Sequence, residues 1–237
     1  MRELPSGFEM FRGDIWETMS PTERRHLLQD VENHVAKEQN RQPRAIIASK
    51  MGSISDCGGY DQVTPYVLSI NEDHLNDESA KKGYNYVCLD TILHEGRHGF
   101  QDDAIQGKLT NDPEKTQIWK ENSAAYKCMQ QDPAYYRFQP LEADAHEAGY
   151  SDTDQIHTAI GNDPSYEKYM EMRKNSDKFC EDQALKMYGL DYESEISHAV
   201  HDNYMDTHSE SQSHETSPGI EPVPEEIKQE SSHARRH

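Results

Sequence analysis

His94, Glu95 and His98 lie within five consecutive residues, in the pattern His-Glu-x-x-His. In an α-helix, residues four apart lie on the same face, with their Cβ atoms about 5–6 Å apart. Two imidazoles at this spacing can bind one zinc ion at Zn–N distances of about 2.0–2.1 Å. Glu95 would then face a water molecule on the metal and could accept its proton. Because the chain has 13 histidines, the pattern can also arise by chance, and its surroundings have to support it.

A second segment, residues 139–148, offers a further ligand. A catalytic zinc site needs a third protein ligand and an open fourth position for water. Pro140 can begin a helix, and small alanines would let that helix pack closely, so we expect Glu142 to be the third ligand. Asp144 and His146 are near enough to orient the imidazoles through hydrogen bonds. His146 and Glu147 are the alternative ligands, and a solvated helix face is the simpler alternative for Glu142.

Hydrolysis of an amide would also need a donor for the oxyanion, besides the metal. The candidates are Tyr135, Tyr136, Arg97 and His146, and the sequence does not choose among them. The two tyrosines could instead belong to the core, and Arg97 could form an ion pair with an acidic neighbour.

The motif lies in an apolar helical context. Four large apolar residues can bury the helix, namely Leu89, Ile92, Leu93 and Phe100. Gly96 would allow close packing on the same helix. Asp90, one turn before His94, could either support a metal-bound histidine through a hydrogen bond or be simply exposed, and we favour the exposed position.

Four other sites carry helix-start signals. Ser20-Pro21-Thr22-Glu23 has the residues of a capping box, and Leu27, Leu28, Val31 and Val35 then form an apolar stripe. Asp-Pro pairs at Asp112, Asp132 and Asp163 predict three more starts, because the carboxylate can accept hydrogen bonds from free N–H groups. We expect the last helix to end near Gly189. Trp119 and Tyr126, after Asp112, are expected in the core.

Between the first helix and residue 85 the pattern favours strands. Residues 44–48 and 63–70 are rich in β-formers, with a turn predicted at Gly58-Gly59. Pro65 predicts that the second strand, or its start, lies at an edge of the sheet. There is no βαβ alternation, so the expected fold class is α+β, with a small antiparallel or mixed sheet followed by helices.

The motifs together resemble a known family. His94-Glu95-x-x-His98 followed by a glutamate on a later helix resembles the gluzincin division of the zincin metallopeptidases. The closer likeness is to small bacterial zincins whose third ligand opens a Glu-x-x-Ala helix, as Glu142-Ala143-Asp144-Ala145 does here. The longer pattern, Leu93-His94-Glu95-x-Arg97-His98-x-x-Gln101 and then Gln139-Pro140-x-Glu142-x-Asp144-Ala145, also resembles zincin-like domains of bacterial mobile or toxin-like proteins.

The resemblance covers roughly residues 85–150. It implies a zincin-like α+β fold with a mixed sheet, an active-site helix and a helical C-terminal part. It also implies a metallopeptidase in which His94, His98 and Glu142 bind Zn²⁺ and Glu95 is the general base that cleaves peptide bonds. The chain is shorter than the large gluzincins and lacks an Asn-Glu-x-x-Ser-Asp segment, so their subsite architecture and substrate class do not carry over.

Two alternatives stay open. Deformylase-like amide hydrolases use His-Glu-x-x-His with an upstream cysteine ligand, and Cys57 lies upstream, although the rest of that family's glycine and glutamine pattern is not visible. The chain could also be a catalytically inactive zincin-like module that binds a partner or a metal. His198 and His201 have a spacing that could bind zinc weakly.

Charge and composition limit the partners. The 237 residues include 44 Asp and Glu against 24 Lys and Arg, a formal net charge of −20. Such a surface repels phosphate, so we predict no nucleic-acid or membrane partner and expect steering to favour basic or neutral peptides. The sequence has no apolar run long enough for a membrane span or a secretory signal. We therefore predict a cytoplasmic location, with delivery by a route that needs no such signal as the alternative.

The composition changes near Leu190. From there to the end, 11 acidic residues face three basic ones, and six of the 13 histidines occur. We therefore predict a folded domain over residues 1–189, with its core between about 8 and 189, and a disordered acidic tail over 190–237. The four cysteines are far apart in the sequence, so reduced thiols are expected.

Overall fold

The computed structural model describes residues 7–61 and 66–189. The α-helices are α1 (Gly13–Trp16), α2 (Pro21–Glu38), α3 (Tyr84–Ile105), α4 (Pro113–Ala124), α5 (Pro133–Phe138), α6 (Pro140–Ile160) and α7 (Pro164–Tyr188). The strands are β1 (Ala45–Ser49), β2 (Gly58–Asp61) and β3 (Val67–Asn71), and short 3₁₀-helices span Phe8–Phe11, Glu72–Leu75 and Ala80–Lys82. The predicted α+β class is confirmed. The predicted tail, with His198 and His201, lies outside the described residues.

The sheet is mixed and has the order β1-β3-β2. β1 pairs with β3 in parallel, with Ala45 opposite Val67, and β2 pairs with β3 in the antiparallel direction, with Gly58 opposite Ile70. Two expectations from the sequence are therefore wrong. Gly58 and Gly59 belong to a strand rather than a turn, and β3 is the central strand rather than an edge, because β1 and β2 cover its two sides. The alternative expectation, that only the start of this strand around Pro65 lies at an edge, falls outside the described residues.

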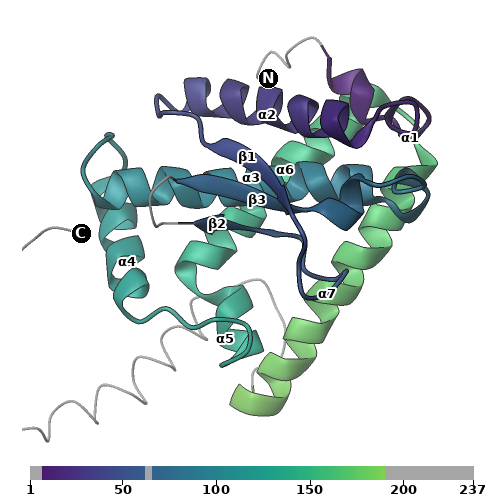
Figure 1. The fold of residues 1–237 in the computed structure, drawn as a ribbon. Helices are drawn as coiled ribbons and strands as arrows, with labels where there is room; N and C mark the ends of the chain where they lie inside the picture. The colour runs from purple at the N-terminus through teal and green to yellow at the C-terminus, as the bar shows by residue number, and fades with distance from the viewer. Residues whose placement is uncertain (1–6, 62–65, 190–237) are drawn as a thin grey trace, which may run out of the picture.

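Helix α3 is the element on which the others assemble. Figure 1 shows α3 crossing the middle of the molecule behind the strands, with α2 alongside it. Its contacts also include α4, α6 and α7. The predicted apolar residues of α3 are buried, with exposed fractions of 0% for Leu89, 1% for Ile92, 5% for Leu93 and 9% for Phe100.

The helix starts follow the local signals in the sequence. Ser20 and Glu23 form the predicted capping box on α2. Asp112, Asp132 and Asp163 each cap the helix that follows, with proline at its first position. Gly189, at φ 68°, ends α7 as predicted. On α7, two large apolar residues, Phe179 and Leu185, are about half exposed (51% and 50%).

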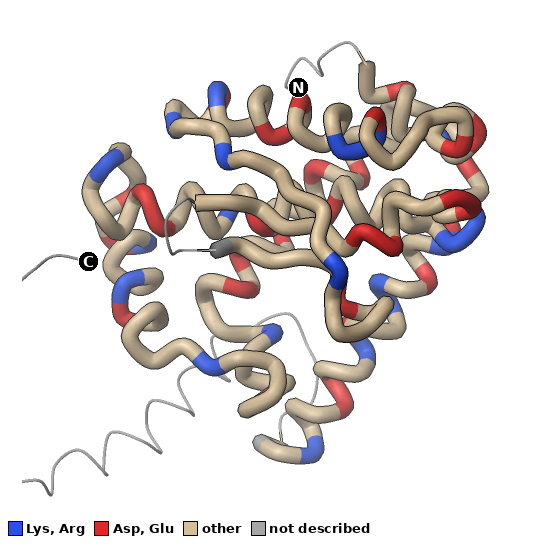
Figure 2. The backbone as a smooth tube through the Cα atoms, viewed as in Figure 1, with Lys and Arg blue, Asp and Glu red and all other residues tan. Residues whose placement is uncertain are grey.

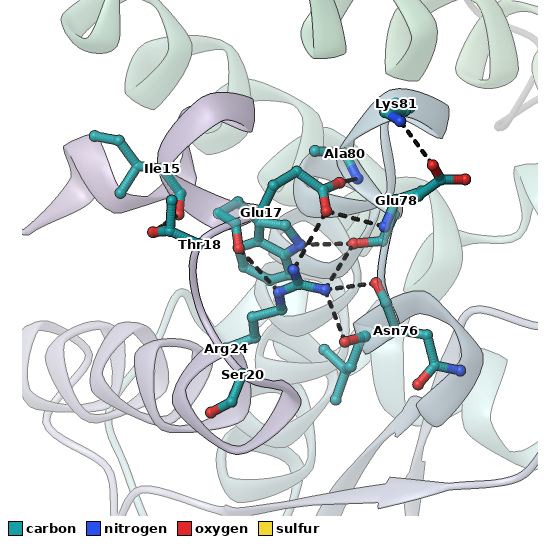
Figure 3. Close-up of polar contacts among 12 residues, drawn as sticks. Ile15, Glu17, Thr18, Ser20, Arg24, Asn76, Glu78, Ala80 and Lys81 are labelled. Carbon is teal, nitrogen blue, oxygen red and sulfur yellow. Dashed lines mark hydrogen bonds and ion pairs between the residues drawn. The ribbon is translucent and has the colours of Figure 1, made fainter.

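A buried arginine joins the N-terminal segment to the turn before α3 (Figure 3). Arg24 is fully buried and donates hydrogen bonds to the carbonyl oxygens of Trp16 and Leu75. Glu17 accepts hydrogen bonds from the backbone N–H groups of Glu78 and Ala80. These contacts satisfy backbone groups that would otherwise be buried without partners.

A buried ion pair between Arg41 and Glu32 packs against α3. Arg41 donates two hydrogen bonds to Glu32, of 2.6 Å and 2.8 Å. A Cβ at Gly96 would lie 3.0 Å from both Arg41 and Glu32, so the close packing predicted at Gly96 is confirmed.

The charged residues lie on helices and loops, whereas the strands are nearly free of them (Figure 2). Over the described ranges, each helix is too short or too polar to cross a bilayer. The four cysteines are free thiols, as predicted.

Candidate metal centre

Three side chains from α3 and α6 meet at one point. The Nε2 atoms of His94 and His98 lie 3.1 Å apart. The Glu142 carboxylate lies 3.3 Å from His94 Nε2 and 3.2 Å from His98 Nε2. Glu142 is in the first turn of α6 and is only 1% exposed. The structure thus brings together the three side chains that the sequence predicted as metal ligands.

The two helices come this close because α6 presents small residues to α3. Ala145 is completely buried, and Gly149 faces the turn of α3 that contains Asp90 and His94. A Cβ at position 149 would overlap Asp90 Oδ1 and would lie 3.4 Å from His94 Cβ. Glycine at this position therefore allows α6 to bring Glu142 against the two imidazoles.

The neighbours of His98 fix which of its nitrogens carries a hydrogen. Gln101 Nε2 donates to Asp144 Oδ2 at 2.7 Å and to the Leu141 carbonyl oxygen at 3.0 Å. The other end of that amide, Gln101 Oε1, lies 2.8 Å from His98 Nδ1. A carbonyl oxygen only accepts, so Nδ1 is the protonated nitrogen of the neutral ring. The lone pair of His98 Nε2 consequently points toward His94 and Glu142.

This donor set fits a divalent cation. Glu142 Oε2 is buried and, among the described residues, has no hydrogen-bond partner. Ligands at about 2.0–2.1 Å from a tetrahedral zinc ion lie about 3.3 Å from one another. The separations of 3.1 to 3.3 Å between the three side chains agree with that value. Two lone pairs and a carboxylate at these distances repel one another unless a cation lies between them.

The pKa values of the metal-free side chains also indicate that this site requires a positive charge. Burial alone would raise the pKa of Glu142, but the charge of His98, together with the close polar contacts and charge of His94, holds that pKa well below its ordinary value. Burial alone would lower the pKa of His98, but Glu142 outweighs it and raises that pKa to about 9. Without a metal, a proton on His98 supplies the positive charge that the carboxylate requires.

Glu95 is held beside the candidate ligands by the sheet. A hydrogen bond from the backbone N–H of Tyr60 in β2 lowers the pKa of Glu95, as do the charges of His94 and His98. Burial is the larger effect, and the pKa of Glu95 is raised. The carboxylate therefore lies next to the candidate metal ligands.

Two cavities meet at Glu95, each of about 580 Å³. The first cavity is lined by strand β2 and by the His98 side of the site, including Tyr60, Tyr126 and Glu142. The second cavity extends from His94 and His146 between α3, α5, α6 and α7. Asp90 lines the second cavity and its Oδ1 atom is buried, so the expectation that Asp90 is exposed is wrong.

The predicted oxyanion donors lie in different environments in the structure. Tyr136 lines both cavities, and burial, followed by the charges of Glu142 and Glu95, raises its pKa. Tyr135 points the other way, is fully buried, and lies in a separate apolar cluster with Phe138. Arg97 donates two hydrogen bonds to Asp144, of 2.7 Å and 3.1 Å, which matches the ion-pair interpretation of that residue.

The alternative ligands are also placed by the structure. The ring of His146 lies 4.4 Å from that of His94. Besides the three side chains described above, two overlapping groups in the described part of the chain could hold a metal, namely His94, Glu142 and His146, and His94, Glu95 and His98. Glu147 is exposed. Cys57 lines the second cavity but belongs to neither metal-capable set found within the described residues.

Two residues of the site were missed from the sequence. Tyr126 donates a very short hydrogen bond to Glu142 Oε1. It was expected in the core, but α4 ends at Ala124, and Tyr126 lies beyond it and is 40% exposed, whereas Trp119 is buried as predicted. Gln101 could have been found from its position three residues after His98, on the same helical face. Tyr126 gave no such signal, because it follows the end of the helix.

The arrangement is therefore a set of three side chains that could hold a metal, an orienting amide and a carboxylate on a shared cavity wall. Comparisons with protein-family models, curated proteins and solved structures gave no match to this chain.

Proposed function

We propose that this chain is a zinc-dependent hydrolase of peptide bonds, in which His94, His98 and Glu142 hold the metal. The observation that carries the proposal is the convergence of His94 Nε2, His98 Nε2 and the buried Glu142 carboxylate within 3.3 Å of one another. Two histidines and one carboxylate could also form a purely structural site. The cavities on both sides of Glu95 favour catalysis, because a structural zinc site is closed to solvent.

Glu95 is the proposed general base. A zinc ion at this site supplies a Lewis acid that polarises the scissile carbonyl and lowers the pKa of water toward ~7. Glu95 accepts the proton of the attacking water and passes a proton to the leaving amine. Burial raises the pKa of Glu95, which suits a group that must first take and then release a proton near neutral pH.

Tyr136 is the proposed donor to the oxygen of the substrate carbonyl. Its side chain lines both cavities and is close to Glu142 and Glu95. A buried phenol keeps its proton, because its pKa is raised far above the ordinary value of 10.0, and it can therefore donate throughout the reaction.

The position of β2 supports a peptide as the substrate. β2 is an edge strand of the described sheet, and Gly58, Gly59 and Tyr60 line the first cavity beside Glu95 and His98. An extended peptide can add to such an edge through main-chain hydrogen bonds. That placement would bring a peptide bond to the metal side of Glu95.

The test separates metal binding from turnover. In purified protein loaded with one zinc ion per chain, Glu95→Gln should keep the metal, because Glu95 is not a ligand. Hydrolysis of a quenched fluorescent peptide library should fall by about 10²–10⁴-fold, because the base is lost. Glu147→Gln is the matched control, since Glu147 is exposed on α6, and it should retain full activity. A fully active Glu95→Gln enzyme would overturn the proposed role of Glu95.

A further inference from the structure

The second cavity begins at the metal site and continues past His94. Its walls come from α3, α5, α6 and α7 and from the segment before β2. Much of the lining is aromatic or apolar, including Tyr84, Val87, Tyr150 and Met172. With about 580 Å³, it is large enough for a long side chain of a substrate.

Asp90 lies in this cavity one helical turn before His94. Its Oδ1 atom is buried and, in the part of the chain that the structure describes, accepts no hydrogen bond. The hydroxyl of Tyr169, a residue 2% exposed, is also buried and has no hydrogen-bond partner there. It is close enough to Asp90 to lower the pKa of that carboxyl group. Burial is nevertheless the larger effect and raises the pKa of Asp90 to about 7.

The positive charges around the cavity are already paired. Arg137 donates to Asp177 Oδ1 at 3.0 Å and 3.1 Å. Arg173 donates to Asp154 at 3.0 Å and its guanidinium lies 3.6 Å from the centre of the Tyr150 ring.

The charges of His94 and Arg173 lower the pKa of Asp90, but neither residue forms an ion pair with it among the described residues. Burial lowers the pKa of both His74 and His146, so these two rings are neutral at pH 7. Asp90 and Glu95 are therefore the carboxylates of this lining that lack a basic partner among the described residues.

We propose that the second cavity binds a lysine or arginine side chain next to the scissile peptide bond, with Asp90 as the partner of its positive charge. This inference rests on the proposed hydrolase function. Asp90 lies about one helical pitch, about 5.4 Å along α3, from His94. A lysine side chain, with its four-carbon stem, has the length to reach from the metal site to Asp90.

The residues that line the cavity match both the aliphatic stem and the charged end of a lysine or arginine side chain. The apolar and aromatic surfaces accommodate the aliphatic stem, and Tyr169 and Asp90 both offer oxygen acceptors to the cationic end. An acidic side chain of the substrate would be repelled by the negative charge of Asp90. An uncharged one would leave the Asp90 carboxylate with no partner other than the Tyr169 hydroxyl in a desolvated site, which is unfavourable.

The test compares peptides that differ at a single residue on either side of the scissile bond. With zinc-loaded wild-type protein, lysine or arginine at one of the two positions should give kcat/KM roughly tenfold or more above norleucine, which has a similar length and no charge. Asp90→Asn should abolish that preference. The variant should fold, because an amide is less costly to bury than a carboxylate. Asp30→Asn, an exposed carboxylate on α2, is the control and should keep the preference.

A binding measurement makes the inference independent of turnover. The zinc-loaded Glu95→Gln protein should bind a fluorescein-labelled lysine peptide roughly tenfold more tightly than its norleucine counterpart, by anisotropy, and Asp90→Asn should remove the difference. If wild type cleaves both peptides equally, the specificity proposal is overturned and the hydrolase proposal stands. If no peptide is cleaved but lysine-selective binding depends on Asp90, the cavity proposal stands and the hydrolase proposal fails. Equal binding of the two peptides would overturn the cavity proposal.

Discussion

The orientation of one imidazole determines what the site can bind. His98 offers its Nε2 lone pair because Gln101 accepts a hydrogen bond from Nδ1, and Gln101 is itself oriented by Asp144 and the Leu141 carbonyl oxygen. Asp144 is in turn paired with Arg97. This chain of hydrogen bonds explains why Arg97 and Asp144 lie near the ligands without touching the candidate metal position.

Loss of the orienting amide should weaken metal binding. Gln101→Leu removes the acceptor for His98 Nδ1 while keeping a side chain of similar size. We expect zinc affinity to fall by about 10–100-fold, measured by competition with a chromophoric chelator. Gln106→Leu is the control, since Gln106 is exposed at the end of α3 and bonds only to Asp102. Unchanged affinity in a folded Gln101→Leu protein would show that His98 does not need Gln101.

At the residue scale, much of the candidate site could be predicted from the spacing of residues in the sequence. The positions of His94 and His98 on one helical face follow from the α-helical period, and Glu142 follows from a proline-initiated helix with small residues. The choice between Tyr135 and Tyr136 could not be made, because adjacent residues on the short helix α5 point to different surroundings. Asp90 was missed because its burial depends on Gly149, on a distant helix.

At the scale of elements, β2 and α3 form the unit that holds the general base. β2 supplies the Tyr60 N–H to Glu95, and Gly58 lets the strand lie directly on α3. A Cβ at Gly58 would overlap the Ser69 carbonyl oxygen of β3 and the Thr91 side chain of α3. The strand can therefore approach the helix only if residue 58 has no side chain.

Substitution of the two adjacent glycines should give different results. Gly58→Ala should lower the free energy of unfolding by about 1–3 kcal/mol, because the added methyl overpacks the strand against rigid neighbours. Gly59→Ala should change stability much less, since its nearest new contact is Ser69 Oγ at 3.5 Å. Urea denaturation followed by circular dichroism measures both values. Equal stability of the two variants would contradict this account of the contact between β2 and α3.

The elements themselves were only partly predictable. The caps at Ser20, Asp112, Asp132 and Asp163 are local, so the sequence indicated each helix start. The sheet order depends on contacts between residues far apart in the chain, which the sequence does not show. A Gly-Gly pair predicts a turn unless the helix that packs against it is known. The sequence therefore predicted strand segments near β1 and β3 but neither β2 nor its position at the edge.

At the scale of the whole molecule, buried polar groups connect the domain. Arg24 anchors the N-terminal segment, the Arg41–Glu32 pair covers α3, and His74 joins the segment before β2 to the turn that follows β3. His74 is 1% exposed, its Nε2 lies 2.8 Å from the Ile54 carbonyl oxygen, and its ring stacks on Tyr84. Nδ1 of His74 is buried without a partner among the described residues, so a second proton on this ring would be unfavourable.

The stability of the domain should therefore depend on pH through His74. Burial lowers the pKa of His74 below 6.5, so the unfolded chain takes up this proton first. The contribution of His74 is complete above pH 6.5 and is lost as the pH falls below that value, by at most about 1.4 kcal/mol per pH unit. Unfolding free energies of wild type and His74→Gln, measured with chelator between pH 8 and 5, should diverge in slope below 6.5. Parallel curves would show that His74 can be charged in the folded state.

The central claim, that two imidazoles and Glu142 hold one metal ion, is tested most directly by the zinc content of purified protein. After dialysis against zinc-free buffer, elemental analysis should find one zinc ion per chain in wild type and in Glu147→Ala. It should find close to none in His94→Ala and Glu142→Ala, with circular dichroism showing that both variants are folded. A full equivalent of zinc in folded Glu142→Ala would contradict the assignment of the third ligand and the mechanism built on it.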